Sequence, residues 1–131
     1  MCLIVFAWHA HPDYRLVLAA NRDEYHARPA RDANWWPDRQ HILAGRDLQA
    51  GGTWLGVSQR GRFATVTNYR EMQRTTGRLR SRGEIVSKFI DSDPGSDLGP
   101  KDFVSSIDGA NYAGYSLLTA DRRQLVYSSN H

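Results

Sequence analysis

Two short apolar runs near the start of the chain constrain its fold most strongly. Residues 3–9 and 15–20 are rich in Val, Ile, Leu and aromatic side chains, which is typical of buried β-strands. Residues 9–14 between them contain Pro12 and Asp13, which favour a turn. Consecutive strands joined by a short turn pair antiparallel. The sequence therefore predicts a hairpin that brings position 22 back beside position 2.

The predicted hairpin carries the single cysteine of the chain and a polar quartet into one neighbourhood. Cys2 precedes the first strand, and the quartet Asn21-Arg22-Asp23-Glu24 follows the second. Cysteine is small enough for the initiator methionine to be removed, and Cys2 would then offer a thiol with an α-amine beside it. Such an amine can serve as the base that activates the nucleophile. The alternatives are a buried, inert cysteine and a solvated turn.

Three side chains are candidates to support this thiol. The guanidinium of Arg22 would favour the thiolate, and Asp23 would orient the α-ammonium group. Asn68 ends a strongly predicted strand, where its amide would donate a hydrogen bond to an oxyanion. An Asx turn is an equally good interpretation of Asn68.

The rest of the chain predicts strands, then two helices, then strands. Residues 25–40 contain Pro29 and Pro37 and are expected to form a long irregular segment that carries the aromatic pair Trp35-Trp36. Ser81 and Glu84 have capping-box spacing at the start of the first helix. The expected elements are a short strand at 42–47, a hairpin of 53–58 and 62–68, helices at 82–91 and 100–107, and a closing hairpin of 112–119 and 124–128.

Length and composition indicate one globular domain. The chain has 131 residues, of which 40% are hydrophobic and 24% charged. Its apolar runs are shorter than a membrane span, so no membrane span is expected. The opening run has no basic residues before it and does not resemble a signal peptide. One cysteine excludes an internal disulfide, and a cytoplasmic location is expected.

The net charge of +3 comes from arginine, which supplies 15 of the 17 basic residues. Seven of these arginines fall between residues 60 and 82, with Glu71 as the one acid among them. Such a cluster can bind anions, but a solvated loop is the simpler interpretation. No nucleic-acid-binding motif accompanies it, so a nucleic-acid partner is not expected.

Two other features have simpler alternatives. His9 and His11 are spaced like a pair of metal ligands, but no third ligand is spaced recognisably, so a turn and no metal site are expected. Trp54 is expected in the core, whereas Trp35 and Trp36 would either line an apolar ligand pocket or fill core.

Several motifs together resemble the Transport and Golgi organisation 2 family, also called the NRDE family. They span the whole chain and occur in the order Met1-Cys2-Leu3-Ile4, Leu18-Ala19-Ala20-Asn21-Arg22-Asp23-Glu24 with Arg28-Pro29, Gly45-Arg46-Asp47, Gly51-Gly52-Thr53-Trp54-Leu55-Gly56, Thr67-Asn68-Tyr69, Ser81-Arg82-Gly83-Glu84 and Gly114-Tyr115-Ser116-Leu117-Leu118. Two departures accompany the resemblance. The family usually has Asn at the place of Ser116, and its members are longer than this chain.

The family is similar to the N-terminal nucleophile (Ntn) hydrolases. The resemblance implies an α+β fold of the αββα sandwich type, expected to be partial because the chain is short. Cysteine-type Ntn enzymes have a cysteine at the place of Cys2, and an arginine and an aspartate close to where Arg22 and Asp23 stand. The resemblance implies the corresponding catalytic roles here. Family members are also linked to haem mobilisation and to acyl-CoA or lipid handling.

Two functions are therefore expected from the sequence. The first is hydrolysis of linear amide C–N bonds without a cofactor, with catalytic residues Cys2, Arg22, Asp23 and Asn68. The second is non-catalytic binding of haem or acyl-CoA, in which Cys2, His9 or His11 would ligate iron and the Arg-rich segment 60–82 would meet propionates or phosphates. The expected ligand-binding residues are Asn21, Glu24, Trp35, Trp36 and Arg46. Further expectations are a small-molecule partner and a homodimer that completes the sheets, and an inactive fragment is a third alternative.

Overall fold

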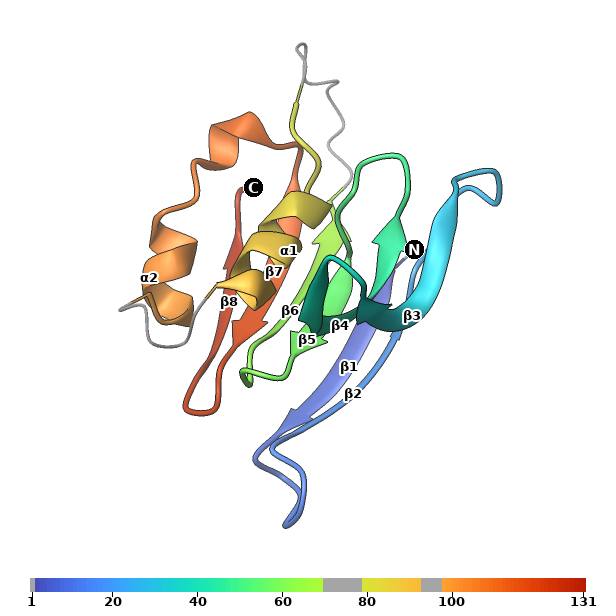
Figure 1. Cartoon of the computed structure of the whole chain (residues 1–131). Helices are drawn as coiled ribbons and strands as arrows, with labels where there is room; N and C mark the ends of the chain where they lie inside the picture. Colours follow the sequence, from blue (N-terminus) through green and yellow to red (C-terminus); the bar gives the residue numbers. More distant parts are fainter. Residues whose placement is uncertain (1, 70–78, 93–97) are drawn as a thin grey trace.

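The computed structural model describes residues 2–69, 79–92 and 98–131, and it has an α+β architecture (Figure 1). Six antiparallel strands form the main sheet in the order β3-β4-β5-β6-β7-β8, and β1 and β2 form a separate two-stranded sheet. The strands are β1 (Leu3–Trp8), β2 (Leu16–Asn21), β3 (Ala30–Trp36), β4 (Arg39–Asp47), β5 (Leu55–Ser58), β6 (Phe63–Asn68), β7 (Tyr115–Ala120) and β8 (Leu125–Ser129). The helices are α1 (Gly83–Asp91), α2 (Pro100–Ser105) and the single 3-10 turn Gly109–Asn111.

The predicted N-terminal hairpin is confirmed. β1 and β2 pair antiparallel with Leu3 opposite Asn21 and Trp8 opposite Leu16. The backbone N–H of His9 donates to the Arg15 carbonyl at 2.7 Å and closes the turn end. His9 has a φ of 52°, a left-handed conformation that histidine tolerates better than most residues. This register places Cys2 and Arg22 just beyond the opposite end of the hairpin.

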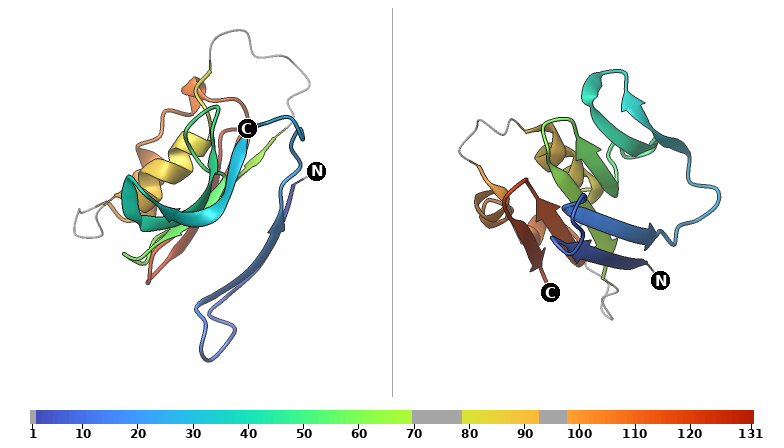
Figure 2. Two further views of the ribbon diagram at one scale, coloured as in Figure 1. Left: turned by 45° about the vertical axis from the view of Figure 1, so that its right-hand side comes forward. Right: turned by 90° about the horizontal axis from the view of Figure 1, so that it is seen from below.

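The main sheet has a different covering on each face. Helix α1 lies against β4, β5 and β6, and α2 contacts β7 and β8. The hairpin β1–β2 lies over the opposite face of the same sheet, as the left view of Figure 2 shows. At its turn end, Nη1 of Arg15 donates to the carbonyl of Arg122 in the β7–β8 turn at 2.7 Å. The molecule therefore has helices, a six-stranded sheet and a two-stranded sheet as successive layers.

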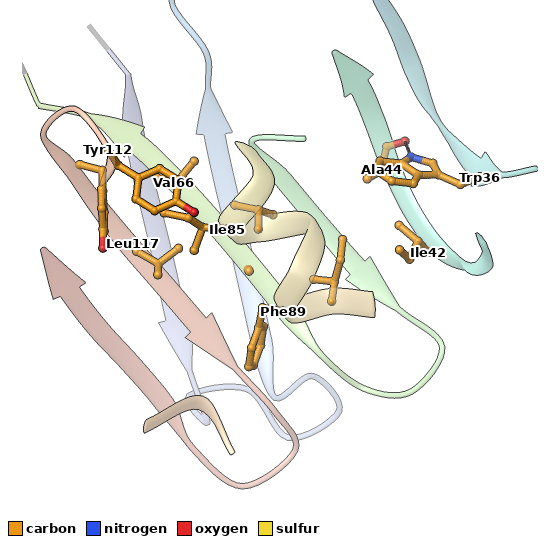
Figure 3. Packing of buried hydrophobic residues seen from close by; sticks show 12 residues of the cluster. Trp36, Ile42, Ala44, Val66, Ile85, Phe89, Tyr112 and Leu117 are labelled. Carbon is orange, nitrogen blue, oxygen red and sulfur yellow. Dashed lines mark hydrogen bonds between the residues drawn. The ribbon is translucent and has the colours of Figure 1, made fainter. Parts of the chain in front are cut away.

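The hydrophobic core lies between α1 and the main sheet (Figure 3). Ile85, Phe89 and Ile90 recur at helical spacing on one face of α1 and are no more than 1% exposed. Successive side chains of a strand point to opposite faces, and Val66 and Leu117 reach this core from β6 and β7. The apolar face of α1 and the inward-facing side chains of the strands therefore form one core. Burial of each aliphatic side chain in it stabilises the fold by about 1.5–3 kcal/mol.

Most predicted elements are confirmed, and two expectations are wrong. Residues 25–40 are not an irregular segment, because they contain the whole of β3 and the start of β4. Pro29 stands immediately before β3, and Pro37 lies in the β3–β4 turn. Neither proline therefore removes a hydrogen bond from the interior of a strand, which is the reason that prolines usually exclude strands.

The capping box is also wrong. The residue that caps α1 is Arg82, in a helical conformation and without a capping side chain, rather than Ser81. The carboxylate of Glu84 instead forms ion pairs with Arg80 and, at 2.8 Å, with Lys88. Lys88 lies one turn after Glu84, so this pair runs along one face of α1. Arg80 precedes the helix, and its pair with Glu84 ties the helix start to the segment before it.

The arginine cluster is not a single solvated loop. Arg62 is 3% exposed, donates to the Leu98 carbonyl and stacks its guanidinium over the Phe89 ring at 4.7 Å. Arg60 donates to the Asp91 carbonyl, and Arg82 donates to the Gly114 carbonyl. Arg70, Arg74 and Arg78 lie outside the described residues. Within the described ranges, no helix combines the length and apolar character that crossing a membrane requires.

Candidate functional site

A cavity of about 440 Å³ lies between the polar end of the β1–β2 hairpin, the main sheet and the start of α1. Its lining joins segments that are far apart in the sequence. The residues that line it include Cys2, Arg22, Asp23, Glu24, Arg28, Arg31, Arg46, Asp47, Thr53, Trp54, Asn68, Arg80 and Arg82. Six of these are arginines and three are acidic, and Asp38 and Glu84 pair with two of the arginines, Arg46 and Arg80, from outside the lining. The cavity therefore has a small excess of positive charge, which favours an anionic ligand.

Cys2 is held at the mouth of the hairpin by two backbone contacts. The Asn21 Oδ1 atom accepts a hydrogen bond from the Leu3 N–H at 3.1 Å, which fixes the chain immediately after Cys2. The backbone N–H of Asp23 donates to Cys2 Sγ at 3.4 Å. The Asn21 side chain and the Asp23 main chain therefore hold Cys2 at this end of the hairpin.

A chain of ion pairs runs from the hairpin to the end of β4. Arg22 Nη2 lies 2.8 Å from the Glu24 carboxylate, and Arg28 Nε lies 3.9 Å from the same oxygen. Arg28 also contacts Asp47 Oδ2, through Nε at 2.9 Å and Nη2 at 2.7 Å. These side chains are no more than 28% exposed, so water screens them only in part. The pairs tie the loop after β2 to the main sheet.

Asp47 is the carboxylate at the main-sheet end of this series of ion pairs. Burial alone would raise the pKa of Asp47, but the hydrogen bond from Arg28 and those from the Ala50 and Gln49 N–H groups outweigh it and hold the pKa below its usual range. The hydrogen bond that Arg28 donates to Asp47 likewise raises the pKa of Arg28. Both groups are therefore charged at neutral pH, and the loop before β3 is fixed against the end of β4.

Asn68 approaches the cavity from the main sheet. It is the last residue of β6, where it pairs with Tyr115 of β7, and its side chain is exposed. Asn68 and Cys2 line the same cavity although they belong to different sheets. This placement is compatible with an amide donor directed at a group that reacts with Cys2.

A second, apolar cavity meets the first at Cys2. This groove has a volume of about 350 Å³ and lies between β1 and the outer face of β6, β7 and β8. Its lining is Cys2, Leu3, Ile4, Phe6, Thr65, Thr67, Ser116, Leu118, Leu125 and Tyr127. Cys2 therefore stands between a cationic compartment and an apolar one.

The structure brings together most of the residues expected at the site. Cys2, Arg22, Asp23, Glu24, Arg46 and Asn68 share the cationic cavity. Asn21 is not among the described residues that line it and instead holds the backbone of β1. Arg28 and Asp47 also line this cavity and were not expected as site residues, although both lie in the motifs Arg28-Pro29 and Gly45-Arg46-Asp47 that carry the family resemblance.

Trp35 and Trp36 lie in a separate cavity of about 410 Å³ between β3 and β4. Trp36 is 3% exposed, belongs to the core and donates to the Ala44 carbonyl at 3.1 Å, whereas Trp35 is 46% exposed. Arg46 lies at the boundary of the two cavities, with its guanidinium 4.3 Å from the Trp36 ring and paired with Asp38. Trp54 packs against the core, as predicted. A ligand role for Trp35 and Trp36 stays a prediction and concerns a different cavity from that of Cys2.

The two histidines lie at the other end of the hairpin from Cys2. His9 follows β1, which Cys2 precedes, and a strand of six residues is about 20 Å long. His11 Nδ1 accepts a hydrogen bond from the Asp13 N–H inside the turn. Neither histidine can therefore share an iron atom with Cys2 in this arrangement. Among the described residues, no three His, Cys, Asp or Glu side chains are grouped closely enough to hold a metal ion.

Comparison with known proteins agrees with the motifs that meet at this cavity. The family model of Transport and Golgi organisation 2 matches residues 1–131. The chain belongs to the Transport and Golgi organisation 2 family. The chain is 44% identical over 128 residues to a Transport and Golgi organization protein 2 homolog of Bos taurus, and 41% identical to the Homo sapiens homolog. Each alignment covers 92% of this chain and 45% of the relative, so the chain spans about half the length of these relatives.

A more distant member of the Transport and Golgi organisation 2 family is found in Drosophila melanogaster. That protein is 39% identical over 101 residues, which cover 69% of this chain and 35% of the relative. Family membership rests on the family model, which matches residues 1–131, and on the Bos taurus and Homo sapiens relatives, which align with 92% of the chain.

Proposed function

We propose that this protein is a cysteine-nucleophile hydrolase of linear amide C–N bonds with an Ntn-type site. The observation that carries the proposal is that Cys2, Arg22, Asp23 and Asn68 line one cavity although they come from two sheets. A nucleophile, a cation, a carboxylate and an amide donor are the groups that amide hydrolysis uses. The proposal requires removal of Met1, which exposes the Cys2 α-amine.

In the proposed reaction, the Cys2 thiolate attacks the amide carbonyl carbon. The oxyanion of the tetrahedral intermediate accepts a hydrogen bond from the Asn68 side-chain amide. The C–N bond then breaks, and the α-amine, which took the thiol proton, gives it to the departing amine. Water hydrolyses the resulting thioester, which releases a carboxylic acid and restores the thiol. Asp23 holds the α-ammonium group, and the Asp23 N–H stabilises the sulfur.

The arrangement of layers in the structure supports the proposal of an Ntn-type fold. Helices cover one face of the six-stranded sheet and a second sheet covers the other, which corresponds to three layers of an αββα sandwich. In the Bos taurus relative, the length outside the matched 45% is available for a fourth layer. We include a cytoplasmic location in the proposal, and the homodimer stays a prediction.

Intact-mass analysis followed by an activity assay tests the proposal. We expect the purified protein to lack Met1, and we expect it to release amines from a panel of linear amides detected by mass spectrometry. Cys2→Ala should abolish turnover, because the nucleophile is lost. Ser128→Ala, on β8 and outside both Cys2 cavities, is a control that should retain it. Retained Met1, or full activity in Cys2→Ala, would contradict the mechanism.

A second candidate function is binding of an amphipathic anion without catalysis, such as haem or an acyl-CoA. The observation that favours it is the junction of the arginine-lined cavity with the apolar groove. For haem, Cys2 would be the iron ligand, and the arginines would face the propionates. Titration followed by visible absorption, repeated with Cys2→Ala and with a double variant His9→Ala/His11→Ala, tests this candidate. A spectral change that is lost in Cys2→Ala alone would support it, and the absence of any change would exclude the haem form.

A further inference from the structure

Cys2 lines two cavities, one rich in arginine and the other apolar. Its position between them determines which half of a substrate binds in which cavity. The arginine-lined cavity extends from Cys2 toward β4 and α1. The apolar groove extends from Cys2 along the outer face of β6, β7 and β8. A molecule whose reactive carbonyl lies at Sγ must therefore direct one half into each compartment.

Strand pairing gives the groove a direction and a length. Thr67 of β6 pairs with Ser116 of β7 at the end of the groove next to Cys2. Two residues further from Cys2 on β6, Thr65 pairs with Leu118 of β7, and Leu118 pairs with Tyr127 of β8. Leu125 marks the far end, opposite Ala120, which pairs with Phe63. Thr67 and Phe63 are four residues apart on β6, which corresponds to about 13 Å of extended strand. An extended acyl chain on the order of ten carbons spans the same length.

The other compartment has the complementary chemistry. Four of the six lining arginines are paired with carboxylates: Arg22 with Glu24, Arg28 with Asp47, Arg46 with Asp38 and Arg80 with Glu84. Arg31 and Arg82 bring the arginines of the lining above the number of these carboxylates. Arginine guanidinium groups bind carboxylates and phosphates in a bidentate geometry. An anionic group is therefore favoured in this cavity and disfavoured in the apolar groove, where it would lose its hydration.

We infer that the substrate is an N-acylated amine with a medium-length apolar acyl chain in the groove and a carboxylate or phosphate on the amine side in the arginine-lined cavity. The inference rests on the proposed function and specifies its substrate class. The Cys2 thiolate forms a thioester with the apolar acyl group, the C–N bond breaks, and the anionic amine leaves with a proton. Water then releases the fatty acid and restores the thiol.

The test uses a series of N-acylglycines together with one reversed amide. N-acetyl-, N-hexanoyl-, N-decanoyl- and N-hexadecanoylglycine vary the acyl length, and the mono-decylamide of succinic acid exchanges the two halves. We expect kcat/KM to be highest for N-decanoylglycine and at least about tenfold lower for N-acetylglycine, because each buried methylene adds to transition-state binding. The reversed amide should be cleaved at least about tenfold more slowly than N-decanoylglycine, because its carboxylate would enter the groove.

A pair of tryptophan variants locates the acyl chain. Leu118→Trp fills the middle of the groove and should move the optimum to N-hexanoylglycine or shorter. Val57→Trp is the matched control, because Val57 lies on β5 of the same sheet, is 37% exposed and lies outside the groove. It should leave the optimum unchanged. A length profile that is flat, or that Leu118→Trp leaves unchanged, would overturn the inference.

Calorimetric titration of Cys2→Ala separates this inference from the catalytic proposal. Without the nucleophile, N-decanoylglycine should still bind more tightly than N-acetylglycine and than the reversed amide. Tight, length-dependent binding without hydrolysis by the parent protein would contradict the hydrolase proposal while retaining the two-compartment assignment. Hydrolysis of amides with no preference for acyl length or amide orientation would support the hydrolase proposal and contradict the two-compartment assignment.

Discussion

Gly52 and Gly83 meet backbone to backbone, which joins the loop before β5 to the start of α1. A Cβ atom on Gly52 would lie 2.7 Å from the carbonyl carbon and oxygen of Gly83. The Thr53 N–H donates to the Gly83 carbonyl at 3.3 Å. Both glycines line the arginine-rich cavity, so this contact fixes the relative positions of two of its walls.

Gly52→Ala should therefore destabilise the protein. The added methyl group has only backbone to meet, and overpacking of this kind costs about 1–3 kcal/mol. Urea unfolding followed by circular dichroism measures the loss. Gly51→Asn is the control, because Gly51 has a φ of 77° with open space around it, and asparagine tolerates that conformation. Equal stability of the two variants would show that the close contact is not a constraint.

Asp47→Asn should remove a pH-dependent contribution to stability. The pKa of Asp47 is lower in the folded protein than in the unfolded chain, so its carboxylate stabilises the fold above the unfolded pKa. This contribution is lost as the pH falls through the folded pKa. We expect Asp47→Asn to cost about 1.5–3 kcal/mol at pH 7, because Arg28 loses a charged partner. The difference from the parent protein should shrink below about pH 4, as unfolding at several pH values would show.

Thr65→Val should be neutral or stabilising. The Thr65 hydroxyl is buried without a partner among the described residues, and an isosteric apolar group removes its desolvation penalty of about 1–3 kcal/mol. Thr119→Val, at a second unpartnered buried hydroxyl on β7, should behave in the same way. Thermal unfolding measures both. A clear loss of stability in Thr65→Val would mean that the hydroxyl has a partner in the free protein.

Asn68→Ala should lower kcat on amides by about 10²–10³-fold while leaving KM within a few-fold, because an oxyanion donor acts in the transition state. Asn34→Ala on β3, outside the Cys2 cavity, is the matched control and should retain activity. Steady-state kinetics with N-decanoylglycine separates the two parameters. A rise in KM with kcat unchanged would place Asn68 in substrate binding instead.

Local patterns were sufficient to predict most elements of this fold. The hairpin of β1 and β2, the helix at 82–91 and the hairpin of 53–58 and 62–68 all follow from short-range signals. β3 was missed because the sequence does not show that Pro29 and Pro37 bound a strand instead of interrupting one.

The part of the site that depends on local pairing was also predicted from the sequence. Cys2 and Arg22 are joined by one hairpin, so pairing alone places them together. The ion pair between Arg28 and Asp47, and the meeting of Asn68 with Cys2, depend on how the two sheets stack. That stacking is set by tertiary contacts which no window of the sequence contains.

The hydrogen bond from Arg15 to the Arg122 carbonyl holds the hairpin to the main sheet at the end away from the site. It fastens the turn end of the hairpin to the β7–β8 turn, far from Cys2. The hairpin itself is poorly buried, with Leu3 58% and Val5 60% exposed, and an isolated pair of strands is only marginally stable. Local opening of this layer would separate the nucleophile from its oxyanion donor while the core beneath α1 stays folded. Inactivation by heat should therefore precede global unfolding.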